Sequence, residues 1–214
     1  NELQGERRFI ASWVPYPDDK ILTTKTKKEY DVLYWGGLHH KNHLDFLDVS
    51  SKFQYNFITL GFNYWPLKDR QYTKYITKQN IPRTDLWDII RKTKITLATN
   101  LLYLNDRQVA AAKKIRNWEK NECLSRVEEK IIPQMKTRAI EATLNRSLLL
   151  IKKDPWNVIE KWYEPDKHFV YYEDKGDLEE KIHEISKNWE DYERIVEAAY
   201  EKSLNNYTTQ HFFN

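Results

Sequence analysis

The chain has 214 residues, of which 40% are hydrophobic and 14% aromatic, and its 35 basic and 32 acidic side chains give a formal net charge of +3. This composition is sufficient for a packed core, and it lacks the large basic excess of a general nucleic-acid binder. The single cysteine, Cys123, excludes an intrachain disulfide, and no apolar run approaches the roughly 20 residues of a membrane-spanning helix. We therefore expect a cytoplasmic protein without a transmembrane segment.

Along the chain, an irregular entry segment is expected over residues 1–28, because Trp13 to Asp19 contains two prolines. Residues 29–214 predict one Rossmann-like α/β domain, since apolar β-forming segments alternate with segments of helical spacing. Strands are expected at 30–35, 53–60, 94–100, 147–152 and 169–172. Helices are expected at 40–52, 68–79, 84–91, 106–130, 135–145, 156–163, 177–187 and 189–204. Strands separated by helices predict a parallel sheet flanked by helices.

Ligands of an open parallel sheet bind beyond the carboxyl ends of its strands. Gly36 and Gly37 directly follow the first expected strand and precede a helix. They can let a phosphate approach the backbone closely, although a tight strand-to-helix turn also explains them. The G-x-G-x-x-G spacing of a dinucleotide site is absent.

A second candidate lies at the start of the helix expected at 135–145. Lys136 and Arg138 occupy its first turn, where cations oppose the helix dipole unless an anion lies between them. A diphosphate would resolve this conflict, because Arg138 offers two parallel donors and Lys136 a point charge. Glu141, one turn further on, can accept hydrogen bonds from both hydroxyls of a ribose. An Arg138–Glu141 surface pair is the alternative explanation.

Three further features bear on base binding, metal binding and nucleic-acid binding. The loop 80–83 could present Ile81 and Pro82 to a flat base, although a plain connection is at least as good an explanation. His39, His40 and His43 resemble a metal cluster, but no cysteine or paired carboxylate completes it, so we predict no metal site. Basic residues at 107–116 are followed closely by four glutamates, so no nucleic-acid partner is expected.

From Tyr30 to the C-terminus, short motifs occur in an order that resembles the C-terminal half of GT-B glycosyltransferases, especially the CgeB-like group of the glycosyltransferase group 1 superfamily. The matching pieces are Asp31 to Gly37, Asp85 to Ile90 followed by Lys94 to Leu97, Lys136 to Thr143, Leu178 to Ile182, and Tyr207-Thr208, with Trp13-Val14-Pro15 at the entry. Each motif is short, and their shared order and spacing carry the resemblance.

The resemblance implies metal-independent transfer of a sugar from a nucleoside-diphosphate sugar to a glycan or other acceptor, without a cofactor. It implies that Glu141 binds the donor ribose and that Lys136 and Arg138 face the diphosphate and stabilise the leaving group. It also implies a phosphate approach at Gly36 and Gly37, and a base flanked by Ile81 and Pro82.

Two features depart from the family pattern. Many relatives carry an acidic residue, in contact with the donor sugar, eight positions before the ribose glutamate, and here that position is Pro133. The N-terminal half of a GT-B enzyme, which supplies the acceptor site, is not recognisable in this chain, which begins with Asn1. We therefore expect a separate N-terminal GT-B domain as a partner. A non-catalytic interaction domain that keeps the fold is the alternative, and affinity for a nucleotide distinguishes the two.

Overall fold

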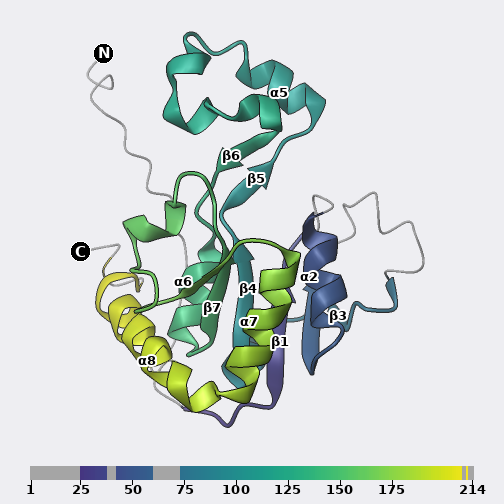
Figure 1. Cartoon of the computed structure of the whole chain (residues 1–214), viewed down its shortest axis with the longest axis vertical. Coiled ribbons are helices and arrows are strands. Elements are labelled where there is room, and N and C mark those ends of the chain that lie inside the picture. Colours follow the sequence, from purple (N-terminus) through teal and green to yellow (C-terminus); the bar gives the residue numbers. More distant parts are fainter. Residues whose placement is uncertain (1–24, 38–41, 60–72, 209–210, 212–214) are drawn as a thin grey trace.

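The computed structural model describes residues 25–37, 42–59, 73–208 and 211 (Figure 1). Most of the entry segment expected at 1–28 lies outside these residues, as do His39, His40 and residues 68–72 of the helix expected at 68–79. Within the described residues, no helix is long and apolar enough to cross a membrane.

The described part of the chain forms a parallel sheet of six strands in the order β3-β2-β1-β4-β7-β8. The strands are β1 (Tyr30–Trp35), β2 (Tyr55–Thr59), β3 (Lys78–Gln79), β4 (Thr93–Thr99), β7 (Leu148–Lys152) and β8 (Val170–Tyr172). The predicted α/β class with a parallel sheet is confirmed. Numbered within this sheet alone, the order is 3-2-1-4-5-6, so the chain reverses direction across the sheet between β1 and β4. Ligands of such sheets bind at this reversal.

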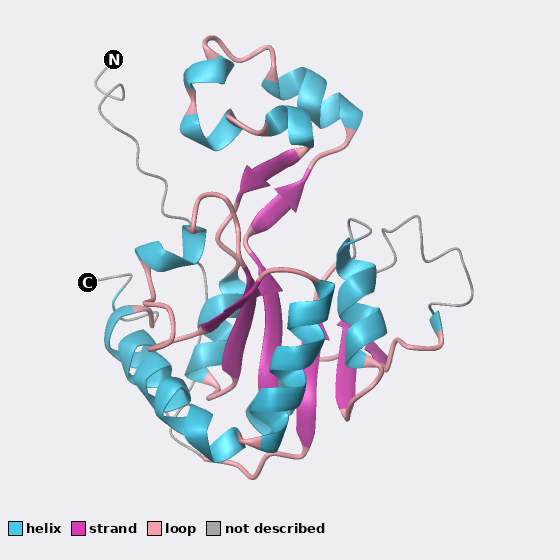
Figure 2. Cartoon of the chain, in the orientation of Figure 1, coloured by secondary structure: helices cyan, strands magenta, loops and turns pink. Residues whose placement is uncertain are grey.

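Helices cover both faces of the sheet (Figure 2). The helices α2 (Asn42–Ser50), α7 (Lys175–Lys187) and α8 (Trp189–Asn206) contribute to the core on one face, and α4 (Arg83–Lys92) and α6 (Thr137–Leu144) to the core on the other. Successive side chains of a strand point to opposite faces, which is why Val32 and Tyr34 join the first core while Leu33 and Trp35 join the second. Because both faces are buried, the strands read as continuous apolar runs.

The expected long helix at 106–130 is wrong. The chain instead forms a lobe, defined here as residues 101–133, which extends beyond the end of β4 (Figure 1). Its base is an antiparallel pair, β5 (Leu101–Tyr103) with β6 (Ile131–Pro133), and its outer part is the short helix α5 (Asp106–Ala112) followed by three 3₁₀ turns at 118–120, 122–124 and 127–129. No residue of α5 is buried, so no packing supports a longer helix.

Local geometry also prevents one helix from continuing through the lobe after α5 ends at Ala112. Asn117 adopts a left-handed conformation with φ of 56°, which a helix cannot continue through. Asn121 then caps the next turn by accepting a hydrogen bond from the Cys123 amide at 2.9 Å. The basic residues at 107–116 are therefore not a stripe along one long helix.

Smaller differences concern element types and boundaries. Thr73 to Gln79, expected to be helical, form a turn and strand β3, and the segment expected to be helical at 156–163 holds the 3₁₀ turn Val158–Lys161. The helix α4 begins one residue before the expected cap Thr84, and Pro82 occupies the cap position.

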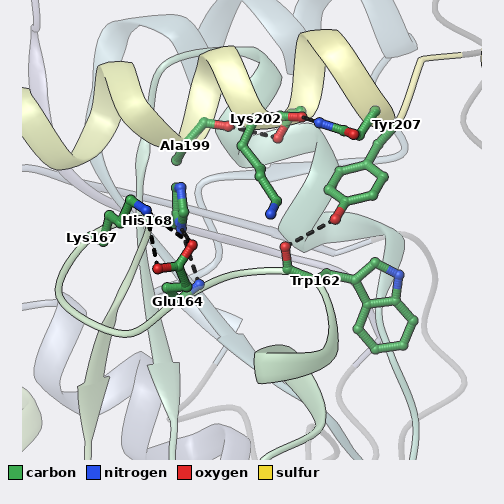
Figure 3. A network of polar contacts seen from close by, with 9 residues as sticks. Trp162, Glu164, Lys167, His168, Ala199, Lys202 and Tyr207 are labelled. Carbon is green, nitrogen blue, oxygen red and sulfur yellow. Dashed lines mark hydrogen bonds and ion pairs between the residues drawn. The ribbon is translucent and has the colours of Figure 1, made fainter.

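Partly buried hydrogen bonds of two side chains, Lys28 and Tyr207, fasten the ends of the domain. The Lys28 ammonium donates to the carbonyls of Arg91, Thr93 and Arg146 at 2.8, 3.0 and 2.6 Å, which holds the entry of the chain against the ends of α4 and α6. At the other end, Tyr207 points from the C-terminus of α8 and donates to the Trp162 carbonyl at 2.9 Å (Figure 3). The Tyr207-Thr208 motif thus begins with a residue that anchors the last helix.

Candidate functional site

A cavity of about 430 Å³ opens at the carboxyl end of β1, beside the reversal of the sheet. It is lined by Trp35 and Gly36 after β1, by Ile81, Arg83 and Leu86 around the start of α4, and by residues 134–138 and Glu141 around the start of α6. Five of the residues predicted from the sequence line this one cavity: Gly36, Ile81, Lys136, Arg138 and Glu141. Segments more than 100 positions apart in the chain therefore meet here.

Arg138 is held in place by aromatic rings and by a glycine. Its guanidinium carbon lies 4.4 Å from the ring centre of Tyr34 and 5.3 Å from that of Trp35. A Cβ atom placed on Gly36 would lie 2.1 Å from Arg138 Nη2, and Gly36 has a φ of +134°, which side-chain-bearing residues rarely adopt. Gly36 is therefore required for the position of this guanidinium.

Lys136 occupies the N-cap position of α6 without a side-chain capping hydrogen bond, and Arg138 is the second helical residue. The first turn of α6 contains no acidic residue, so the partial positive charge of the helix end adds to both cations. Burial, and then the charge of Arg138, lower the pKa of Lys136 to about 8. The Lys136 ammonium donates to the side-chain oxygen of Gln134. This corner of the cavity thus gathers positive potential that an anion would relieve.

Glu141 is the buried carboxylate of the cavity, with a side chain only 5% exposed. It forms an ion pair with Arg83 and accepts a hydrogen bond from the side chain of Trp35. Burial raises the pKa of Glu141, and the charges of Arg83 and Arg138 offset this only in part. The observed partner is Arg83, so the alternative of an Arg138–Glu141 surface pair does not describe the site.

The two remaining predicted residues are neighbours of the lining. The carbonyl of Gly37 accepts a hydrogen bond from the Tyr34 hydroxyl at 3.0 Å, and Pro82 is the exposed cap residue of α4. Neither is among the described residues that line the cavity. Their expected contacts with phosphate and base stay predictions.

Sequence reasoning missed Arg83 and Trp35 as parts of the site. Arg83 was noted only as a member of a loop, yet it is a cation in the first turn of α4. A cation there opposes the helix dipole, as Lys136 and Arg138 do at α6, although the first turn of α4 also contains Asp85. Trp35 carries no such signal, because its contact with Glu141 depends on how β1 and α6 pack.

His43, the described member of the candidate histidine cluster, packs against Tyr34, Phe46 and Tyr103 in the core. Among the described residues, no group of three or more His, Cys, Asp or Glu side chains is arranged to hold a metal ion.

A family model described as glycosyl transferase-like matches residues 25–214. No curated protein matches the chain. Among solved structures, the chain is similar to the C-terminal domain of a glycosyl transferase group 1 family protein (LpcC) from Francisella tularensis, with 10% identity, a TM-score of 0.54, and coverage of 93% of this chain and 97% of that domain.

Two longer proteins with bound ligands share the fold. Anabaena Alr3699/HepE in complex with UDP and glucose has 10% identity and a TM-score of 0.55, over 83% of this chain and 44% of that protein. The pneumococcal O-GlcNAc transferase GtfA in complex with UDP and GlcNAc has 12% identity and a TM-score of 0.55, over 88% of this chain and 35% of that protein. The chain therefore spans less than half the length of these two proteins.

Proposed function

The chain belongs to the glycosyl transferase-like family, and on that premise we propose that it is the donor-binding half of a GT-B glycosyltransferase, which transfers a sugar from a nucleoside-diphosphate sugar to a glycan or other acceptor. The observation that carries the proposal is one cavity with two cations at a helix N-terminus and a buried carboxylate one turn away. The CgeB-like subgroup and the domain boundary between residues 28 and 29 are finer parts of this proposal.

The diphosphate lies, in this proposal, between Lys136, Arg138 and the N-terminus of α6. A helix N-terminus binds anions because its first N–H groups have no partner within the helix and its dipole favours negative charge. The lowered pKa of Lys136 supports this placement, since burial first and then the charge of Arg138 make the ammonium unfavourable, and a bound anion would offset both effects. Close approach of the diphosphate is expected at Gly36 and Gly37.

The ribose binds to Glu141, whose two oxygens can accept from adjacent hydroxyls of the sugar. An ionised carboxylate is a stronger acceptor than a neutral group, and its burial strengthens the interaction further. The base then lies toward Ile81 and Pro82 at the start of α4. Ile81 lines the cavity and supplies an apolar wall.

In the chemical step, the bond between the anomeric carbon of the sugar and the diphosphate oxygen breaks, and its electron pair stays on the leaving diphosphate. A bond forms between the anomeric carbon and the acceptor oxygen, whose proton passes to a base that the N-terminal GT-B domain would supply. Arg138 and Lys136 stabilise the charge that develops on the leaving group. Electrostatic stabilisation of this kind is usually the largest single contribution to catalysis. In this proposal the two cations do this without a metal ion, and an N-terminal GT-B domain supplies the acceptor site.

The test is a calorimetric titration of the 214-residue chain with UDP, GDP and dTDP. We expect one of these to bind, and we expect Arg138→Met and Glu141→Gln each to weaken binding by about tenfold or more, the value of one charge-assisted hydrogen bond. Arg126→Met is the matched control, because Arg126 forms an exposed pair with Glu129 in the lobe. A folded chain that binds none of the three nucleotides refutes the proposal and favours a non-catalytic interaction domain in the cytoplasm.

A further inference from the structure

Arg83 is paired with Glu141, the carboxylate that the proposed function assigns to ribose binding. It is the first residue of α4, and its guanidinium reaches across to Glu141 on α6 to form an ion pair. The side chain of Arg83 is 48% exposed, whereas that of Glu141 is 5% exposed. The ion pair thus joins a buried acceptor to a donor that lies at the cavity rim and can leave it.

Arg83 lies in the first turn of α4, which also contains one acidic residue, Asp85. A cation in the first turn of a helix opposes the helix dipole. Its guanidinium carbon also lies 5.6 Å from the ring centre of Trp87, a contact that keeps the side chain over α4. The ion pair with Glu141 therefore directs this cation into the cavity.

The ion pair and a ribose diol compete for the same atoms. Arg83 contacts Oε1 of Glu141, and Trp35 also donates to this carboxylate. With Arg83 paired to it, the Glu141 side chain is only 5% exposed, so a diol reaches both of its oxygens only when the guanidinium moves away. A ligand with one hydroxyl gains too little to displace it.

We propose that Arg83 is a latch on Glu141: it neutralises the buried carboxylate in the empty cavity and is displaced by the adjacent hydroxyls of a ribonucleotide. This inference rests on the proposed function and adds a residue that sets its selectivity. The latch keeps Glu141 ionised and ready, and the cost of displacing it falls on ligands that use the diol. Arg83 is thus a positioning residue, which acts on the ligand through Glu141.

The latch predicts how affinity depends on the diol. UDP displaces Arg83, whereas 2′-deoxy-UDP binds through its diphosphate and leaves the latch closed. Replacing Arg83 by Met removes the competition, so the ratio of UDP to 2′-deoxy-UDP affinity at pH 8 should rise by roughly three- to tenfold, which is the range for one partly exposed charged hydrogen bond. Arg126→Met should leave the ratio unchanged.

A second readout is the pH profile of UDP binding. Because Arg83 favours the ionised form of Glu141, Arg83→Met should move the loss of UDP affinity on acidification to higher pH. Arg83→Lys keeps the charge and should restore the wild-type profile. A purely structural role for Arg83 would change neither the diol ratio nor this profile.

The experiment is calorimetry of the 214-residue chain and its variants with UDP and 2′-deoxy-UDP, and Arg83→Gln provides the same comparison if the Met variant does not fold. A raised diol ratio supports the latch. Binding of UDP by the wild type with an unchanged or lowered ratio in the variant overturns the latch but not the proposed function. If the wild type binds GDP instead of UDP, the same comparison is made with GDP and 2′-deoxy-GDP, and a wild type that binds no nucleoside diphosphate overturns both.

Discussion

Replacing Gly36 by Ala changes the position of one guanidinium without removing any charged group from the cavity. The new methyl group would lie 2.1 Å from Arg138 Nη2, against an ordinary contact of about 3.5 Å. Arg138 must therefore retreat by about 1.4 Å, the difference between these two distances. A guanidinium at the end of a flexible side chain can make this movement, so the substitution displaces Arg138 rather than unfolding the domain.

The expected magnitudes follow from the geometry of this site. A φ of +134° costs a side-chain-bearing residue of the order of 1–3 kcal/mol. The retreat of Arg138 also weakens its contacts with the Tyr34 and Trp35 rings, each worth about 0.5–1 kcal/mol. We therefore expect the free energy of unfolding to fall by about 2–4 kcal/mol. Affinity for a nucleoside diphosphate should fall about tenfold or more, because a misplaced guanidinium loses a charge-assisted hydrogen bond.

The assays are urea unfolding followed by circular dichroism and titration with UDP under native conditions. Gly176→Ala on α7 is the matched control, since its Cβ would lie at an ordinary 3.4 Å from Asp174 Oδ1. That variant should bind UDP as the wild type does. If Gly36→Ala stays folded and binds UDP with unchanged affinity, Arg138 does not contact the diphosphate and the reasoning is refuted.

Three further perturbations have expected outcomes. Because the pKa of Lys136 is about 8, this lysine loses its proton between pH 7 and pH 9, so UDP affinity should fall by up to about tenfold over that range, and by less in Lys136→Met. Burial lowers the pKa of Lys28 to about 7 from 10.5, so the unfolded chain binds more protons between these values; urea unfolding should show stability rising with pH there, by at most about 1.4 kcal/mol per pH unit, and less steeply in Lys28→Met. Thr143→Val removes hydroxyl contacts with Tyr163 and Ser203 at 3.1 and 2.7 Å, so the free energy of unfolding should fall by about 1–3 kcal/mol.

Each of these outcomes has a control outside the feature that it tests. Lys153→Met, at an exposed lysine paired with Glu173, should keep the wild-type pH dependence of UDP binding. Lys27→Met and Thr84→Val, at exposed positions, should leave the pH dependence of stability and the free energy of unfolding nearly unchanged. A target variant that behaves like its control contradicts the corresponding prediction.

The sheet and its covering helices were predictable because their patterns are local. A parallel strand buried on both faces reads as a continuous apolar run, as in Leu148 to Ile151, and the helices that cover it show helical spacing. The lobe was not predictable in the same way. Its two strands have three residues each and pair across a separation of about 30 positions, and its helix ends at Ala112, where neither glycine nor proline marks the end.

The candidate site was predictable to the extent that its signals are electrostatic and local. Lys136 and Arg138 stood out because two cations at a helix start oppose the dipole, and Arg83 has a weaker form of this signal at the start of α4, whose first turn also contains an acidic residue. The contacts that complete the site join distant segments. Gly36 makes room for Arg138, about 100 positions later, and Trp35 donates to Glu141. Both contacts depend on how β1 packs against α6.

The most direct test of the account is a crystal structure of this chain with UDP. We predict diphosphate oxygens within about 3.2 Å of the Arg138 guanidinium and of the first N–H groups of α6, with the ribose hydroxyls on Glu141. A complex in which the diphosphate binds elsewhere, with Lys136 and Arg138 making no contact with it, would contradict the account.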